Sequence, residues 1–436
     1  MMEPTLVLDN AKVFLGSCLD VLPTLPDNSV DAVVTDPPYE LGFMGKSWDA
    51  SGIAYNVKVW EECLRVLKPG GHLLAFGGSR TWHRLAVAIE DAGFEMRDSI
   101  AWLYGSGFPK SHNISKAIDK LHGAEREVVG RNPNSREQAT KANTLYESGT
   151  VGKTDYITEP ATDDAKAWDG WGTALKPAFE PIVVARKPVV GTVAENVLQF
   201  GTGALNIDAS RIGTETVTIN TFDNGAKPFG DAVGEPFTSR ESVGRWPANI
   251  ILDETTAELL DEQSGNVRLT EGGQNIGKFN FAPAENTNGN KRIQGKVTLG
   301  GASRFFYVAK ANKKDRNEGL EELPLSKPGA IYNERPSGGL NAHLHGEDSK
   351  PVKNFHPTVK PTELMRYLVR LVTPPNGVVL DPFTGSGSTG KAALLEGFQF
   401  VGVELTEEYL PIIAGRLQFV AEKVAQEKGD DLFADL

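Results

Sequence analysis

The stretch "VVLDPFTGSGSTGKAALLE", residues 378–396, decides the fold class. Its apolar start, Val378–Leu380, predicts a buried strand that ends at Asp381, and a glycine-rich turn then leads into a helix over Thr389–Glu396. The following apolar run predicts another strand, which ends at Glu404. A strand, a tight turn, a helix and a further strand in succession are typical of an α/β protein with a mostly parallel sheet and helices on both faces.

The same alternation occurs nearer the start of the chain. Apolar runs predict strands over Val30–Thr35 and His72–Phe76, and helical spacing predicts helices over Val57–Leu67 and Thr81–Ala92. Between the two α/β parts, the sequence is rich in Gly, Asn, Ser and Thr, except for the apolar stretch "LKPAFEPIVVARKP". We therefore expect an α/β core with two insertions, divided into residues 1–107, 108–173 (insertion), 174–189 (core strand), 190–354 (second insertion), 355–426 and 427–436 (acidic tail).

The composition predicts a globular protein of a reducing compartment. The 436 residues are 40% hydrophobic and 23% charged, and only two are cysteines, which excludes a disulfide scaffold or a cysteine metal cluster. No apolar run approaches the roughly 18 residues that span a bilayer, and the first residues lack the pattern of a signal peptide. The sequence therefore predicts a cytoplasmic location, with no membrane contact.

The distribution of charge leaves two interpretations open. The formal net charge is -12, yet residues 291–360 hold 13 basic and 7 acidic residues, whereas residues 404–436 hold 3 basic and 8 acidic ones. A basic segment within an acidic protein allows a local nucleic-acid face, because lysine and arginine neutralise phosphates. A solvated, lysine-rich loop explains the same counts equally well.

The glycine-rich turn predicts a site for a nucleoside-containing cofactor. Gly385 and Gly387 allow the backbone to approach a ligand closely, and the N-terminus of the next helix offers free N–H groups. Glu404 follows Gly385 by 19 residues and ends the neighbouring strand, where its carboxylate can accept hydrogen bonds from both ribose hydroxyls.

Three interpretations of this turn compete. The run from Gly385 to Lys391 nearly matches a phosphate-binding P-loop, but Ala392 stands where a magnesium-binding Ser or Thr belongs, and Asp381 and Phe383 crowd the turn. A tight packing turn without a ligand is the second interpretation. S-adenosylmethionine fits better than either, because its carboxylate suits the helix N-terminus and its ribose suits Glu404.

A second strand-ending turn, Asp36-Pro37-Pro38-Tyr39, predicts the acceptor site. An exocyclic amine on a nucleobase is a poor nucleophile, so two acceptors aimed at its N–H bonds would assist it. The Asp36 carboxylate and the Pro37 carbonyl suit this task, since consecutive prolines fix φ and carry no N–H groups. Tyr39 offers a ring for stacking, and a base in a duplex would first have to flip out.

At these residues the chain resembles the DNA amino-methyltransferases of the beta group, in which the catalytic motif precedes the cofactor motif. Asp36-Pro37-Pro38-Tyr39 matches the family's D-P-P-Y, and the stretch Asp381–Gly387 matches its F-x-G-x-G motif. The stretch "HPTVKPTELMRYLVRL", residues 356–371, is similar to the family's cofactor-flanking segment.

The resemblance implies S-adenosylmethionine as cofactor, double-stranded DNA as substrate and an exocyclic base nitrogen as acceptor. An aspartate at the start of D-P-P-Y resembles the adenine-N6 enzymes more than the cytosine-N4 ones, which remain the alternative. A catalytically silent DNA-binding module is a further alternative. The implied site consists of the catalytic residues Asp36, Pro37, Pro38 and Tyr39 and the cofactor-binding residues Asp381, Phe383, Gly385, Ser386, Gly387, Thr389, Glu404, Thr358, Lys360 and Ser17. No metal is expected.

The resemblance also interprets the rest of the chain. It makes residues 1–107 the catalytic half, 190–354 a target-recognition region and 355–426 the cofactor-binding half, with a homodimer and a cognate restriction endonuclease as further candidate partners. His356, Thr358 and Lys360 would line the methionine end of the cofactor. Glu180 and Lys176 are candidates for the cleft or for packing.

Ser17 departs from the family pattern, because an acid that helps to hold the cofactor commonly stands there. The sequence leaves open whether affinity suffers or whether Asp20 compensates in part. His343 and His345 lack a third metal ligand and are expected to be exposed polar residues. Trp48 is expected either to contact the base or DNA, or to serve as a packing anchor, and Trp168 and Trp171 to form the core of the first insertion.

Overall fold

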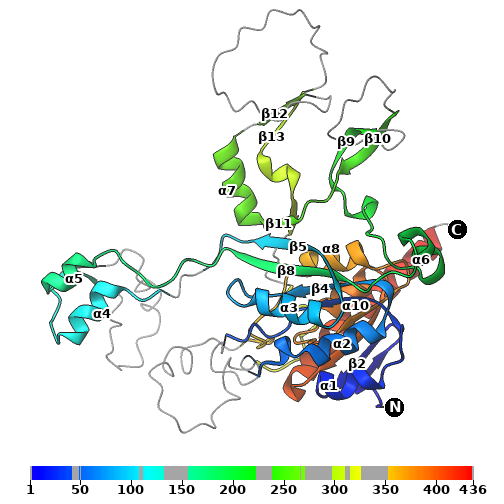
Figure 1. Ribbon diagram of the computed structural model, residues 1–436, viewed down its shortest axis with the longest axis horizontal. Coiled ribbons are helices and arrows are strands. Elements are labelled where there is room, and N and C mark those ends of the chain that lie inside the picture. The colour runs from blue at the N-terminus through cyan, green and yellow to red at the C-terminus, as the bar shows by residue number, and fades with distance from the viewer. Residues whose placement is uncertain are drawn as a thin grey trace, which may run out of the picture. The chain divides into compact units, whose positions relative to one another are not determined.

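The structure is a computed structural model that describes residues 2–41, 49, 51–107, 111–131, 156–221, 238–265, 267–270, 297–309, 315–325 and 352–434. The chain divides into two compact units (Figure 1). The core unit consists of Met1–Gly105 and Phe179–Leu436, and the small unit of Ser106–Ala178. All the residues of the candidate site belong to the core unit.

A ten-stranded sheet forms the centre of the core unit. Every neighbouring pair of its strands is parallel except the pairs that involve β1 or β8, which confirms the predicted α/β fold with a mostly parallel sheet. In spatial order the strands are β1 (Leu6–Leu8), β2 (Ala11–Leu15), β16 (Gln399–Glu404), β15 (Val378–Asp381), β3 (Val30–Thr35), β4 (Leu67–Phe76), β8 (Phe179–Arg186), β5 (Glu95–Leu103), β11 (Ile250–Asp253) and β14 (Tyr307–Ala309).

Helices cover both faces of this sheet (Figure 1). Side chains on β3 alternate between the two faces, so Ala32 and Val34 belong to one hydrophobic cluster and Val33 to the other. Burial on both faces explains why the parallel strands are apolar runs rather than alternating ones. The first cluster includes α8 (Thr362–Val372), α9 (Ser388–Leu395) and α10 (Leu410–Ala434), and the second includes α1 (Cys18–Val21), α2 (Val57–Val66) and α3 (Trp82–Asp91).

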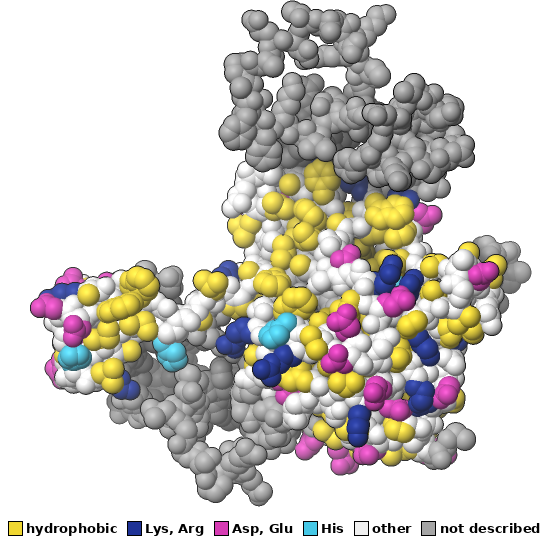
Figure 2. Space-filling model, viewed as in Figure 1, with side chains coloured by type: hydrophobic (Ala, Val, Ile, Leu, Met, Phe, Trp, Pro, Cys, Tyr) yellow, Lys and Arg dark blue, Asp and Glu magenta, His cyan; other side chains and the backbone are white. Residues whose placement is uncertain are grey.

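The remaining elements are short helices, hairpins and 3₁₀ turns. In the core unit they are α6 (Val193–Phe200), α7 (Glu254–Ser264), the hairpins β9–β10 (Ile212–Thr221, Thr238–Arg245) and β12–β13 (Val267–Thr270, Val297–Gly300), and the 3₁₀ turns η1 (Leu22–Thr24), η4 (Ile53–Tyr55), η6 (Asp208–Ser210), η7 (Ala302–Phe305) and η8 (Glu407–Tyr409). The small unit holds α4 (Ile114–Leu121), α5 (Asp163–Ala167) and the pair β6–β7 (Val128–Arg131, Tyr156–Thr158). Figure 2 shows acidic and basic side chains spread together over the face of the core unit that carries α2 and α3.

Strands from the part of the chain between the two α/β parts join the central sheet. The apolar stretch in "LKPAFEPIVVARKP" forms β8, as predicted, and the stretches "ANIILD" and "RFFYVAK" contribute β11 and β14 to the edge of the sheet. The region 190–354 therefore adds strands to the sheet, while its role in target recognition stays a prediction. The strand predicted over His72–Phe76 begins earlier, at Leu67, because Leu67 pairs with Val30 and a bulge accommodates the intervening residues.

One expectation was wrong. Trp168 and Trp171 do not form a core: their side chains are 46% and 58% exposed, and they pack edge to face on each other with ring centroids 5.0 Å apart. The last helix, α10, continues to Ala434 and so extends into the acidic tail.

Candidate active site

The turns that follow β3 and β15 lie at the same edge of the sheet. The two strands are parallel neighbours, with Val379 opposite Ala32 and Leu380 opposite Val33. At their carboxyl ends, the Thr35 hydroxyl donates a hydrogen bond of 2.6 Å to Oδ1 of Asp381. The structure therefore brings together the two motifs that lie about 345 residues apart in the sequence.

Asp36 has one oxygen bound and one oxygen free. Its Oδ2 accepts a hydrogen bond of 2.8 Å from Nζ of Lys360, whereas its Oδ1 is buried and has no hydrogen-bond partner among the described residues. Burial raises the pKa of Asp36, Lys360 opposes this rise, and Glu180 adds to it. An unpaired buried carboxylate oxygen is costly unless a donor reaches it, so this atom is suited to accept an N–H group of a ligand.

Lys360, Tyr39 and Glu180 surround the bound oxygen of Asp36. Nζ of Lys360 also lies 3.1 Å from the Tyr39 hydroxyl and 3.2 Å from Oε2 of Glu180, and the Tyr39 hydroxyl donates to the same Oε2 at 2.7 Å. Burial alone would lower the pKa of Lys360, but Asp36 and Glu180 together raise it to about 12. Pro37, buried, and Pro38, half-buried, connect Asp36 to Tyr39.

The structure thus places Lys360 beside the catalytic motif, and its assignment to the methionine end of a cofactor stays a prediction. Glu180, on β8, is brought to the site, whereas Lys176 belongs to the small unit. Tyr39 uses its hydroxyl to bind Glu180, and its role in stacking a base also stays a prediction.

The glycine-rich turn is held by Glu404 at the end of β16. Gly385 has a φ of 54° and donates its N–H to Oε2 of Glu404 at 2.7 Å, and the N–H of Thr406 donates to Oε1 at 2.8 Å. Each carboxylate oxygen keeps a further lone pair for a hydroxyl group. Burial raises the pKa of Glu404 to about 7.

The Gly385 position is also close to His356. A Cβ atom on Gly385 would lie 2.9 Å from Nε2 of His356, and the other ring nitrogen of His356 lies 2.9 Å from the carbonyl oxygen of Thr358. Burial lowers the pKa of His356 to about 3, so its ring is neutral near pH 7. Thr358 is exposed.

Asp381, Phe383 and Thr389 stabilise the turn from within. Oδ1 of Asp381 accepts the N–H of Phe383 at 3.0 Å in addition to the Thr35 hydroxyl. Burial raises the pKa of Asp381 to about 6, against the hydrogen bonds from Thr35, Thr389 and Phe383. The Phe383 ring contacts the Trp60 ring, with centroids 6.2 Å apart.

Arg416 also holds this turn, and the sequence did not predict this role. Its side chain, on α10, is fully buried, and Nη1 donates to the carbonyl oxygen of Ser386 at 2.6 Å, to Oγ of Ser386 at 3.0 Å and to Oγ of Ser388 at 3.1 Å. The sequence does contain an indication of this role, because an arginine within the apolar face of the last helix needs buried partners.

Ser17 forms the N-cap of α1. Its hydroxyl accepts the N–H of Leu19 at 3.2 Å and caps α1, while the N–H of Gly16 donates to the carbonyl oxygen of Glu404 at 2.8 Å. The residue therefore lies next to the end of β16, and its cofactor role stays a prediction. Asp20 is exposed.

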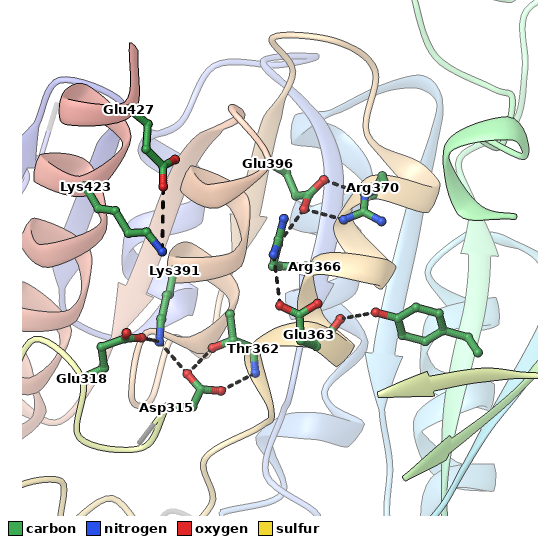
Figure 3. Close-up of polar contacts among 11 residues, drawn as sticks. Asp315, Glu318, Thr362, Glu363, Arg366, Arg370, Lys391, Glu396, Lys423 and Glu427 are labelled. Carbon is green, nitrogen blue, oxygen red and sulfur yellow. Dashed lines mark hydrogen bonds and ion pairs between the residues drawn. The ribbon is translucent and has the colours of Figure 1, made fainter. Parts of the chain in front are cut away.

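The geometry around Lys391 contradicts the P-loop interpretation. Figure 3 shows its ammonium directed at two carboxylates, Oδ1 of Asp315 at 2.5 Å and Oε2 of Glu318 at 2.8 Å, and its side chain is 2% exposed. Asp315 in turn accepts the N–H of Thr362 at 2.7 Å and so caps α8. A P-loop lysine must reach the phosphates of a nucleotide, whereas this one is bound inside the protein.

Replacing Lys391 by methionine is expected to lower the free energy of unfolding by about 3 kcal/mol, because Asp315 loses its buried partner. Lys423, whose exposed side chain lies 4.0 Å from Glu427, is the matched control, and its change to methionine should cost less than about 1 kcal/mol (Figure 3). Chemical denaturation measures both values. Equal costs would contradict the structural role, and magnesium-dependent phosphate release from ATP that requires Lys391 would restore the P-loop interpretation.

Some expectations fall on residues that the structure does not describe: Trp48, His343, His345 and much of the basic segment 291–360. Within the described residues, no group of three or more His, Cys, Asp or Glu side chains could hold a metal ion. In that same part of the chain, none of the helices combines the length and the apolar character needed to cross a membrane.

The chain is similar in sequence to known proteins. The family model N6_N4_Mtase, described as DNA methylase, matches residues 30–415. The type II methyltransferase M.Cfr9I of Citrobacter freundii is 40% identical over 91 residues, which are 20% of this chain and 30% of that protein. The DNA adenine methyltransferase YhdJ of Escherichia coli (strain K12) is 38% identical over 72 residues, 16% of this chain and 24% of that protein. The chain therefore spans less than a third of the length of each of these two relatives.

Among solved structures, the PvuII DNA methyltransferase, described as cytosine-N4-specific, is 13% identical with a TM-score of 0.40, over 95% of this chain and 88% of that one. A complex of M1.HpyAVI with SAM is 13% identical with a TM-score of 0.35, over 93% of this chain and 99% of that one.

Proposed function

Because the chain belongs to the N6_N4_Mtase family of DNA methylases, we propose that it transfers a methyl group from S-adenosylmethionine to the exocyclic amine of a flipped base in double-stranded DNA, with adenine N6 as the acceptor. The free Oδ1 of Asp36 is the observation that carries this proposal. An amine that forms a bond to carbon becomes acidic and must lose a proton, and this oxygen is a buried base in the turn where the family motif predicts one.

Asp36 and Pro37 act on the amine. The Asp36 carboxylate accepts one N–H bond and the Pro37 carbonyl accepts the other, which directs the nitrogen lone pair toward the methyl group. When the nitrogen bonds to the methyl carbon, the carbon–sulfur bond breaks with its electron pair on sulfur. One proton then passes from nitrogen to Oδ1 of Asp36, and a neutral methylamine remains.

The cofactor site fits S-adenosylmethionine, which supplies an electrophilic methyl group. The Gly385 turn is kept open by the absence of a side chain beside His356, so a ligand can approach its backbone. Glu404 has lone pairs left for the ribose hydroxyls, and the N-terminus of α9 offers N–H groups to the cofactor carboxylate, since its cap Gly387 has no side chain.

Adenine is proposed because the motif begins with Asp36 rather than serine. The silent DNA-binding module is disfavoured, since Asp36, Tyr39, Gly385 and Glu404 are present and lie at one edge of the sheet. The cytoplasmic location, the homodimer and the cognate restriction endonuclease stay predictions from the sequence.

Expression of the full chain in a host that lacks DNA methylases tests the proposal. Nucleoside mass spectrometry of the host DNA is expected to detect N6-methyladenine, and the same host with an empty vector is the control. N4-methylcytosine would keep the methyl transfer and correct the base. DNA without either mark, in cells that hold the soluble folded protein, would overturn the proposal and favour the silent module.

A further inference from the structure

We infer that Lys360 and Glu180 are positioning residues for the Asp36 carboxylate: Lys360 fixes Oδ2 so that Oδ1 stays free for the amine, and Glu180 fixes Lys360. The inference rests on the proposed function and deepens it. Neither residue needs to touch the base, because both act through Asp36.

The contacts of Lys360 account for all the donors of its side chain. A lysine ammonium has three N–H bonds, and Nζ of Lys360 has three oxygen partners, namely Oδ2 of Asp36, the Tyr39 hydroxyl and Oε2 of Glu180. No donor is left for Oδ1 of Asp36. The carboxylate is therefore held through Oδ2, and Oδ1 is available to a ligand.

Burial keeps this arrangement in place. The Lys360 side chain is only 8% exposed, and its Nζ lies 4.8 Å from the centroid of the Phe76 ring and 5.3 Å from that of the Tyr39 ring. Two aromatic faces leave the ammonium little room to turn away from its oxygen partners. Glu180 projects from β8, a central strand of the sheet, and so provides a rigid second anchor.

The charges of the three residues also suit the reaction. When all three are ionised, Asp36 and Glu180 carry one negative charge each and Lys360 carries one positive charge, so the group has a net charge of about -1. Positive charge develops on the amine nitrogen as it bonds to carbon, and a net negative site stabilises it. Without Glu180 the group would be neutral, so Glu180 supplies the excess charge as well as an anchor.

The ionisation of Asp36 depends on the groups that face it from several elements. Lys360 lowers the pKa of Asp36, whereas burial and Glu180 raise it. Asp381 is a further acid that interacts with Asp36, and the hydroxyls of Tyr39 and Tyr104 stay neutral because burial raises the pKa of each. Asp36 accepts a proton only when ionised, so activity falls as the pH falls through its pKa.

Two variants should therefore move the acid limb of the rate profile in opposite directions. Lys360→Met removes a cation beside Asp36, so the limb should move to higher pH by about 1–3 units, with a fall in kcat and little change in the KM for S-adenosylmethionine. Glu180→Gln removes an anion, so the limb should move to lower pH by up to about one unit. Lys12→Met on β2 and Glu61→Gln on α2, both exposed, are matched controls that should leave the profile unchanged.

The titration of the Asp36 carboxyl can be measured directly, even in a variant that has no activity. In protein with ¹³C-labelled aspartate carboxyls, the Asp36 signal, assigned with Asp36→Asn, should titrate at higher pH in Lys360→Met and at lower pH in Glu180→Gln. If Lys360→Met does not fold, Lys360→Arg keeps the charge but changes its geometry, so kcat should fall without a large shift of the acid limb.

The outcomes separate the inference from the proposed function. Wild-type protein that methylates DNA, with both variants unshifted or shifted in the same direction, would overturn the positioning roles and leave the proposed function intact. Wild-type protein that methylates no DNA would overturn the proposed function, and the carboxyl titration alone would then decide whether Lys360 and Glu180 control Asp36.

Discussion

Replacing Asp36 by alanine is expected to slow methyl transfer by about three orders of magnitude while S-adenosylmethionine still binds. Oδ1 of Asp36 is the free acceptor in the turn after β3, and alanine leaves the amine proton without a base. The cofactor turn does not depend on this residue, because Glu404 and Arg416 hold it from β16 and α10. Single-turnover rates on DNA and calorimetric titration with S-adenosylmethionine measure the two quantities.

The fold should survive the Asp36→Ala change. Lys360 keeps the Tyr39 hydroxyl and Glu180 as partners, so no buried charge is left unpaired. Asp91→Ala, at the exposed end of α3, is the control and should keep the wild-type rate. Loss of cofactor binding in Asp36→Ala would contradict the division of roles between the two turns, as would a rate within tenfold of wild type.

The sequence predicted the part of the site that depends on the sheet. Asp36 and Asp381 each follow an apolar run that reads as a buried strand, and the carboxyl ends of parallel strands meet at one edge. The hydrogen bond between Thr35 and Asp381 shows that β3 and β15 are direct neighbours at this edge. The expected parallel direction of the strands was sufficient for this prediction, because it does not depend on the conformation of any single side chain.

The direction of single side chains could not be predicted in the same way. Lys360 lies in an irregular segment before α8, where no periodicity indicates which neighbour a side chain contacts, and the structure places it on Asp36. For Arg416, the spacing of α10 predicts a buried face but not the partner, Ser386, which comes from another part of the chain. Trp168 and Trp171 differ from the prediction, because large apolar residues are usually buried, whereas this pair packs on itself at the surface.

Replacing Gly385 by alanine is expected to weaken S-adenosylmethionine binding by about 100-fold. Gly385 has a φ of 54°, where a side chain costs about 1–2 kcal/mol, and the new Cβ would lie 2.9 Å from Nε2 of the buried His356. Either the turn or the histidine must shift, and a shift of the turn breaks the hydrogen bond from Gly385 to Glu404, worth about 1.5–3 kcal/mol. Together these costs are about 2.5–5 kcal/mol. Because a turn that has shifted must return to its wild-type shape to hold the cofactor, we expect about 3 kcal/mol of this to be lost from binding, or about a hundredfold in affinity. Calorimetric titration measures the change.

Gly397→Ala is the matched control for this prediction. Gly397 has a φ of 77°, so alanine carries a comparable backbone strain there, but its Cβ would meet nothing within 4 Å. This variant should lose about 1–2 kcal/mol of folding free energy and keep its affinity for S-adenosylmethionine. Adding His356→Ala to Gly385→Ala removes the clash but not the strain, so part of the affinity should return. Equal losses of affinity in Gly385→Ala and Gly397→Ala would mean that the turn after β15 does not hold the cofactor, because strain alone would then explain both.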